Sequence, residues 1–301
     1  MAACLMACWG VVLMAQAPGG GATGMRPAEP SAEALPEALA QMLETERAFA
    51  ARALEAGWKQ AFLDFFAFNA IGFEKGQPGL ARDQIRQQPD PEAGHRLLWE
   101  PRLGDVSGSG EIGYLVGPVQ SIAPQRDNGR PRHSVYASIW RRQRDGAFKV
   151  VLDAGVPVPA PPPFDPGFTR AAHADRFTGD YDETTPPLAA ADGVLNAALR
   201  TNQARAYRGR LAPAARLHRP NLRPLVGETA ITRWLVTQPP FPQADTLYAE
   251  SARSGDLGYS WGLYRVRGRG ASPGPGGFYV RVWTRARTGQ WTVVLDVLQP
   301  Q

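Results

Sequence analysis

The chain has 301 residues, of which 44% are hydrophobic and 20% charged, a length and composition that suit two globular domains and exclude a disordered chain. The formal net charge of +5 comes from side chains scattered along the sequence. Nucleic-acid binding needs basic residues concentrated on one face, so we expect no nucleic-acid partner.

The N-terminal segment predicts export. No charged side chain occurs between Ala2 and Ala15, and Ala15-Gln16-Ala17 is a small-x-small pattern suited to cleavage, so residues 1–17 are interpreted as a signal peptide. This predicts a periplasmic or secreted bacterial protein. The segment Leu5 to Cys8 loosely resembles a lipobox, which makes a lipoprotein the weaker interpretation.

The mature chain would contain no thiol, because both cysteines lie in the predicted signal peptide. This excludes disulfides, cysteine nucleophiles and thiolate metal ligands. Residues 18–34, rich in Gly, Pro and Ala, are expected to form a disordered lead-in. No later run approaches the ~20 apolar residues of a membrane span, so no stable membrane span is expected.

Residues 35–156 predict a first domain in which helices precede strands. Apolar residues recur at helical spacing on both sides of Gly57, and a short strand and a short helix follow. Four strands separated by turns then complete the domain. The expected elements are helices at 35–56, 58–66 and 79–88 and strands at 71–74, 97–106, 112–122, 134–143 and 148–156.

A proline-rich linker at 157–187 separates this domain from a second one at 188–301. Its prolines favour an extended, stiff conformation up to Pro166, and the polar residues that follow are expected to be irregular. The second domain repeats the order of the first. Its expected elements are helices at 189–211 and 227–237 and strands at 216–219, 246–253, 257–267, 277–287 and 291–298.

The two domains are copies of one unit. Residues 145–153 match residues 288–296 at an offset of 143, and residues 109–114 match residues 254–259 at an offset of 145. Tyr136 and Trp140 match Tyr279 and Trp283 at the first of these offsets. Collinear matches of this kind indicate a tandem duplication, with one hydrophobic interior expected in each copy.

Early helices followed by an antiparallel meander define an α+β fold. The order of elements, the closing strand Gly146 to Asp153, and the strands Ile112-Gly113-Tyr114 and Tyr136 to Arg142 resemble the NTF2-like superfamily, in particular its SnoaL-like and DUF4440-type members. The resemblance implies two tandem cone domains, each with N-terminal helices and a curved antiparallel sheet. It also implies an apolar pocket of the kind in which relatives bind steroids, polyketides or other small hydrophobic molecules.

Candidate catalytic residues follow from this resemblance. Asp153 recurs as Asp296 in the second copy, and with Tyr114 or Tyr136 it would supply a general base and a hydroxyl in a dry cavity. The alternative, which the sequence favours, is that each Asp caps a turn or pairs with an Arg at the sheet rim. The four histidines lack metal-ligand spacing and are interpreted as solvated or singly hydrogen-bonded, so no metal site and no cofactor are expected.

Candidate ligand-binding residues are mostly aromatic, although an aromatic stripe at helical spacing is also typical of plain core. Arg281 between two aromatic residues could clasp a carboxylate or stack on the outer face of the sheet, and the abundance of Arg in this chain favours stacking. The candidates are Trp58, Phe62, Phe66, Phe73, Trp99, Tyr114, Trp140 and Arg281.

The sequence favours a noncatalytic module that binds a small hydrophobic molecule or supports assembly, with its domains paired in cis through their sheets as a pseudo-dimer. The alternative is an isomerase, dehydratase or cyclase that acts on a small hydrophobic substrate in the first domain. A third, weaker hypothesis has the more basic second domain binding an anionic envelope polymer.

Overall fold

The computed structural model describes residues 35–73, 77–171, 176–177, 187–268 and 274–300. The predicted signal peptide and lead-in lie outside these residues. The segment Leu35–Gln301 forms one compact unit. Among the described helices, none is long and apolar enough to cross a membrane.

The described part of the first half contains three helices, α1 (Glu37–Ala56) and α2 (Trp58–Phe65) at its start and α3 (Ala81–Gln87) after the first two strands. Gly57 separates α1 from α2 because its φ of 82° lies in the left-handed region, which glycine adopts without strain. Helix α1 buries a single stripe at helical spacing. The stripe consists of Leu39, Met42, Leu43, Glu46, Phe49 and Ala53.

Eight strands form the first sheet, in the order β2-β1-β7-β6-β5-β4-β8, and β3 also pairs with β5. Strands β5, β6 and β7 form the antiparallel meander, whereas β1 pairs in parallel with β7. The strands are β1 (Phe66–Gly72), β2 (Gly79–Leu80), β3 (Arg96–Trp99), β4 (Leu103–Val106), β5 (Ile112–Ile122), β6 (Arg132–Arg142), β7 (Phe148–Val158) and β8 (Thr169–Arg170).

The strand predicted at 97–106 is two strands. Both β3 and β4 pair with β5, but three residues, 100–102, stand between them opposite only two residues of β5. Pro101 in this insertion has no amide hydrogen to donate to the ladder. The backbone of Glu100 also approaches Gly117 so closely that a Cβ there would lie 1.9 Å from the Glu100 carbonyl oxygen.

The second half repeats this plan, with a six-stranded sheet in the order β10-β9-β14-β13-β12-β11. The region predicted to be helical at 189–211 contains two helices and ends at the first residue of β9, which pairs in parallel with β14. The elements are α4 (Leu188–Leu199), α5 (Gln203–Tyr207), α6 (Glu228–Leu235), β9 (Leu211–His218), β10 (Leu225–Val226), β11 (Gln243–Ser251), β12 (Leu257–Arg265), β13 (Gly276–Arg285) and β14 (Trp291–Pro300).

Strand register makes the two halves comparable residue by residue. Ser138 of β6 pairs with Asp153 of β7, and Arg281 of β13 pairs with Asp296 of β14. Both pairs are related by the offset of 143 seen in the sequence. The α+β architecture predicted from the sequence is therefore confirmed, with the predicted meander extended by a parallel strand in each sheet.

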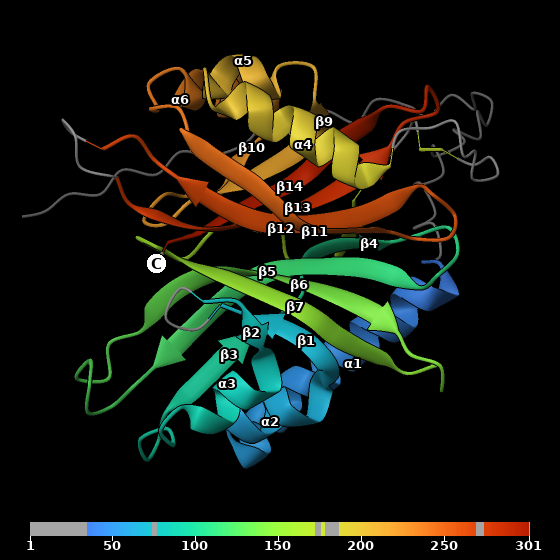
Figure 1. The fold of residues 1–301 in the computed structure, drawn as a ribbon. Coiled ribbons are helices and arrows are strands. Elements are labelled where there is room, and N and C mark those ends of the chain that lie inside the picture. The colour runs from blue at the N-terminus through green and yellow to red at the C-terminus, as the bar shows by residue number, and fades with distance from the viewer. Residues whose placement is uncertain (1–34, 74–76, 172–175, 178–186, 269–273, 301) are drawn as a thin grey trace, which may run out of the picture. The chain divides into compact units, whose positions relative to one another are not determined.

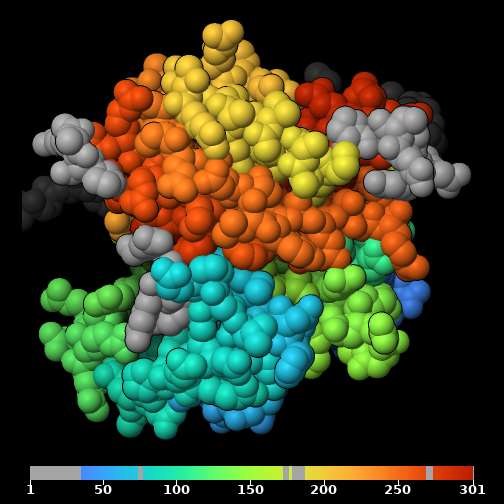
Figure 2. Space-filling view, in the orientation of Figure 1, coloured from blue at the N-terminus to red at the C-terminus, as the bar shows by residue number. Residues whose placement is uncertain are grey.

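The helices of each half lie on one face of its sheet, and the two sheets face each other across the opposite faces (Figure 1). Phe73 after β1 stacks on Phe278 of β13 with ring centroids 4.7 Å apart. Figure 2 shows one face of the molecule, where orange residues of the second half lie directly on blue-green residues of the first.

The buried hydrophobic residues of both halves form one contiguous cluster, so the expectation of a separate interior in each copy is wrong. The reason is that each sheet is covered on both faces, by its own helices and by the other sheet. Among the described strands, each sheet still takes its strands from one half of the sequence, and β8 of the linker joins the first sheet.

Two corresponding turns meet where the halves touch. The Ser254 hydroxyl contacts the Ser109 hydroxyl at 3.1 Å and also accepts from the Ser109 backbone amide at 3.0 Å. The two serines occupy the same position in the repeat. A contact between equivalent residues is the mark of a two-fold, isologous interface.

Part of the predicted linker is integrated into the fold. Strand β7 continues to Val158, and β8 pairs in parallel with β4. Arg170 and Arg176 both form ion pairs with the buried Asp105, and Arg176 also pairs with Asp256 of the second half. These contacts connect the part of the linker after Pro166, which was expected to be irregular, to both halves.

Candidate functional site

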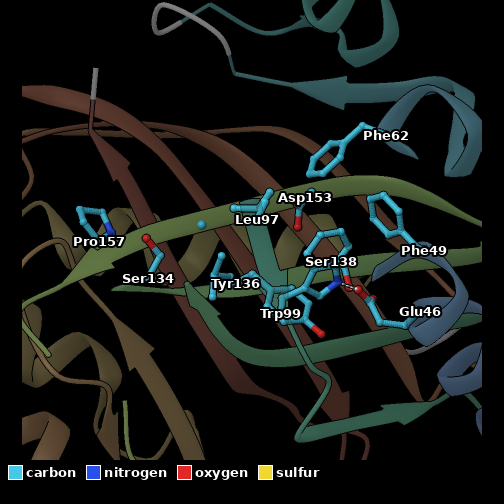
Figure 3. A pocket seen from close by; sticks show the side chains of 12 residues that line it. Glu46, Phe49, Phe62, Leu97, Trp99, Ser134, Tyr136, Ser138, Asp153 and Pro157 are labelled. Atoms are coloured by element: carbon cyan, nitrogen blue, oxygen red, sulfur yellow. Dashed lines mark hydrogen bonds between the residues drawn. The ribbon is translucent and has the colours of Figure 1, made fainter. Parts of the chain in front are cut away.

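A cavity of about 220 Å³ lies between the helices and the sheet of the first half. Phe49, Phe62 and Leu97 form part of its apolar wall. Glu46 of α1 and Asp153 of β7 supply carboxyl groups, and Figure 3 shows both side chains pointing into the same space. Apolar lining with a few convergent polar groups is typical of a small-molecule site.

Glu46 is almost fully buried and is held by side chains of the sheet. Its carboxylate accepts hydrogen bonds from Trp99 Nε1 at 2.6 Å, Ser138 Oγ at 2.9 Å and Trp140 Nε1 at 2.9 Å. Burial raises the pKa of Glu46 to about 7, although these hydrogen bonds oppose the rise. The group is thus poised between its two protonation states near neutral pH.

Asp153 faces the same cavity and is only half-buried, because the cavity gives it access to solvent. Removal from bulk water raises the pKa of Asp153 to about 7, and the negative charge of Glu46 adds to the rise. No described basic side chain forms an ion pair with Asp153.

Tyr136 completes the polar wall. Its hydroxyl is buried and has no hydrogen-bond partner of good geometry among the described residues, although Glu46 and Asp153 are near enough for their charges to act on it. Burial and these two negative charges raise the pKa of Tyr136 well above its ordinary value, so the hydroxyl stays a proton donor. The hydroxyl interacts with Glu46 as a donor, and it also faces the cavity, where a ligand can contact it.

In the second half, the side chain of Arg281 occupies the place that corresponds to this cavity. Arg281 is fully buried, and its guanidinium donates to Asp192 Oδ1 at 2.6 Å, to Asn196 Oδ1 at 2.8 Å and to Asp296 Oδ2 at 2.7 Å. It also lies 3.9 Å from the centroid of the Tyr279 ring. Ser138 stands at this register position in the first half, where the cavity is open.

The two equivalent aspartates therefore differ in acidity. Burial opposes ionisation of Asp296, but the positive charges of Arg219 and Arg281 outweigh it and hold the pKa of Asp296 below its ordinary value. The pKa of Asp153, which has no arginine partner among the described residues, is shifted in the opposite direction, upward. The second half therefore has a closed ion-pair network bridged by Arg281, whereas the first half has a cavity lined by two carboxyl groups without a basic partner in the part of the chain that the structure describes.

The structure brings several of the predicted residues to the cavity or next to it. Phe62 and Trp99 line the cavity. Trp140 donates a hydrogen bond to Glu46, which also lines it. Phe66 packs against Phe62 with ring centroids 5.0 Å apart, and Trp58 packs against the same ring at 5.8 Å. The last two belong to the aromatic cluster behind the lining.

Two predicted residues of the first half lie elsewhere. Tyr114 pairs with Ile139 on β6, so it projects from the sheet face opposite to Ser138 and Tyr136, and the charges of Asp105 and of Arg216 in the second half act on it. Phe73 lies between the halves, against Trp261 and Phe278.

The favoured interpretations of Asp153 and Arg281 require correction. Asp153 neither caps a turn nor pairs with an Arg at the rim; it lines the cavity. Asp296 does pair with arginines, but inside the second half. Arg281 does not stack on an outer face, because its strand presents that side chain to the helices, where it contacts Asp192 of α4.

His218 also differs from expectation. It is fully buried, neither ring nitrogen has a hydrogen-bond partner among the described residues, and burial lowers its pKa to about 3. His95 does form a single hydrogen bond, to Ser121 Oγ at 2.9 Å. His173 lies outside the described residues. Within those residues, no group of three His, Cys, Asp or Glu side chains could hold a metal ion.

Sequence reasoning missed Glu46. The signal was present in the apolar stripe of α1, where Glu46 occupies a buried position between Leu43 and Phe49. An ionisable residue at an interior position of an amphipathic helix is either paired or functional.

The sequence matches no protein-family model and no curated protein. Solved structures with a similar fold include NTF2-like and ketosteroid isomerase-like proteins, each aligned over about 40% of the chain.

A ketosteroid isomerase-like protein from Erwinia carotovora atroseptica is 10% identical and aligns over 40% of this chain and 96% of its own, with a TM-score of 0.32. An NTF2-like protein of unknown function from Exiguobacterium is 18% identical over 41% of this chain and 99% of its own, with a TM-score of 0.26. A protein from Catenulispora acidiphila, in complex with S-DNPA, is 9% identical over 40% of this chain and 92% of its own, with a TM-score of 0.31. These similarities concern the fold alone.

Proposed function

We propose that this chain is an exported protein whose first half binds a small, largely apolar molecule and whose second half is its structural partner. The observation that carries the proposal is the exchange of Ser138 for Arg281 at one register position. The exchange leaves a cavity of about 220 Å³ in the first half, whereas an arginine occupies the corresponding place in the second. In this proposal the two sheets pair as a pseudo-dimer within one chain.

The proposal is tested by filling the cavity with the residue that the second half uses. Ligand-observed NMR against a panel of small aromatic and alicyclic molecules should detect binders of the wild-type chain. Ser138→Arg should abolish their binding, because the new guanidinium would extend between Glu46 and Asp153.

The matched control is Thr169→Arg, which adds the same charge at an exposed position. This variant should bind the panel like the wild type. Binding that survives Ser138→Arg unchanged would place the ligand elsewhere and overturn the proposal.

A second candidate is an enzyme of the isomerase, dehydratase or cyclase type. It is favoured by Glu46 and Asp153, two carboxyl groups with pKa values of about 7 in one cavity, since a general base works best near the operating pH. Tyr136 would donate to a substrate oxygen.

The test is exchange of α-hydrogens of small cyclic ketones for deuterium, followed by NMR. Exchange catalysed by the wild type and lost in Asp153→Asn would favour the enzyme. Binding of the same ketones without exchange would favour the noncatalytic module.

A further inference from the structure

The second half shows how a guanidinium is accommodated between two carboxylates of this fold. Arg281 donates to Asp192 of α4 on one side and to Asp296 of β14 on the other, with hydrogen bonds of 2.6 and 2.7 Å. The guanidinium carbon lies 3.9 Å from the centroid of the Tyr279 ring. This arrangement combines charge-assisted hydrogen bonds with a cation–π contact.

The first half presents the same groups without the cation. Asp153 corresponds to Asp296 by register, and Tyr136 corresponds to Tyr279 by the repeat. Glu46 has on α1 the place that Asp192 has on α4, since each accepts a hydrogen bond from the residue at the exchanged position, Ser138 or Arg281. A cavity replaces the guanidinium, and the buried Tyr136 hydroxyl lies beside Glu46 in its wall, as the Tyr279 hydroxyl donates to Asp192 in the second half.

We infer that the first-half cavity binds a small organic cation, with a guanidinium or amidinium head between Glu46 and Asp153 and an apolar body against Phe49 and Phe62. The inference rests on the proposed binding function and names the class of ligand. In the second half this place is occupied by the chain's own guanidinium, so Arg281 serves as an intramolecular counterpart of the ligand.

Charge balance supports a cation over a neutral molecule. In the second half, Arg219 and Arg281 both pair with Asp296, and Arg281 also pairs with Asp192. In the first half, no described basic side chain contributes to the acidity of Glu46 or Asp153. A cation supplied by the ligand would provide the missing charge, and burial between two carboxylates strengthens its attraction.

The apolar wall explains why the ligand needs a body as well as a head. The cavity of about 220 Å³ exceeds the space of a guanidinium alone, and it extends along Phe49, Phe62 and Leu97. Phenylguanidinium has both parts. Phenylurea has nearly the same shape without the charge, so the pair isolates the contribution of the cation.

The experiment is isothermal titration calorimetry of the purified chain with phenylguanidinium and with phenylurea at pH 8. We expect phenylguanidinium to bind at least about tenfold more tightly, since hydrogen bonds to ionised partners are roughly twice as strong as neutral ones. Its affinity should fall between pH 8 and pH 6, because Glu46 and Asp153, with pKa values of about 7, become protonated. Tyr136 and Glu100 are the other titratable groups acting here, and neither supplies a positive charge.

Two variants locate the site. Asp153→Asn should remove most of the preference for the cation, and Ser138→Arg should abolish binding of both molecules, whereas Thr169→Arg should behave as wild type. Circular dichroism establishes that each variant is folded, and the wild-type comparison of the two molecules requires no variant.

The outcomes separate this inference from the proposed function. If phenylurea binds as tightly as phenylguanidinium and Ser138→Arg blocks both, the cavity binds small molecules but the preference for a cation is wrong. If neither molecule binds at about 10 mM, a concentration that detects very weak affinity, and the panel of neutral molecules also fails, both are overturned.

Discussion

The substitution Arg281→Met tests whether the second half is stabilised by its buried guanidinium. The variant keeps an unbranched apolar stem but removes the guanidinium, with its charge and three hydrogen bonds, to Asp192, Asn196 and Asp296. Removing one partner of a buried ion pair typically costs about 3–5 kcal/mol, because the remaining charges are left uncompensated. Arg219 still pairs with Asp296, so we expect a loss of about 4 kcal/mol in the free energy of unfolding.

This loss corresponds to a decrease of about 8–16 °C in Tm for a unit of this size. The assay is denaturant unfolding at pH 7 and at pH 4, with thermal unfolding alongside. In the wild type the folded-state pKa of Asp296 is lowered, so its contribution to stability is present above the ordinary pKa and lost as the pH falls through the folded value. The difference between wild type and variant should therefore be similar at pH 7 and at pH 4, and it should shrink only at a pH below the ordinary pKa of 3.8.

The control is Arg253→Met, which breaks the ion pair of a mostly exposed arginine with Glu111. Exposed pairs contribute less than about 1 kcal/mol, so this variant should unfold like the wild type. A loss of less than about 1 kcal/mol for Arg281→Met at pH 7, or a loss that has already disappeared at pH 4, would refute the assigned role of the guanidinium.

Three further predictions concern the first half and the contact between halves. Glu46→Gln should raise the free energy of unfolding at pH 8 by up to about 3 kcal/mol but leave it unchanged at pH 4. The reason is that the pKa of Glu46 is about 7 in the folded protein and 4.5 ordinarily, so ionisation of Glu46 destabilises the folded state as the pH rises from 4.5 to 7. Equal effects at both pH values in denaturant unfolding would contradict this. Ser138→Arg should lower the pKa of Asp153 from about 7 to below its ordinary value, and a ¹³C carboxyl titration that leaves it unchanged would show that the guanidinium does not reach it. Phe73→Ala should destabilise the chain by about 3 kcal/mol through loss of the stacked contact with Phe278, measured by denaturant unfolding; a loss similar to that of an exposed Phe68→Ala control would argue against the contact.

The order of elements was predictable because it depends on local patterns. The stripe of α1, the break at Gly57 and the turns of the meander are all encoded within a few residues. The division of the strand at 97–106 was not, because it depends on the backbone of Glu100 meeting Gly117 of another strand.

The site was predictable only in part, because each sheet is covered on both of its faces. Asp153, Tyr136, Phe62 and Trp99 were identified, but Tyr114 was assigned to the wrong face. The alternation of side chains along a strand assigns each residue to one of two faces of the sheet, but it does not say which face is covered by helices. Here both faces of each sheet are buried, so hydrophobicity does not distinguish them.

Glu46 and Arg281 show a second limit of sequence reasoning. The partners of Glu46 include Trp99 and Trp140, which lie 53 and 94 residues away in the chain. The guanidinium of Arg281 meets Asp192 across 89 residues. No local sequence pattern links residues so far apart in the chain, so only the three-dimensional structure identifies the partners of these buried side chains.

The contact between Ser109 and Ser254 has a genetic consequence. In a homodimer one gene encodes both copies of every site, so a change that fills one cavity also fills the other. Fusion of the two copies keeps the symmetric contact at these serines while each cavity is encoded separately. Selection for binding can then act on one copy and selection for rigidity on the other, without the compromise that a shared gene imposes.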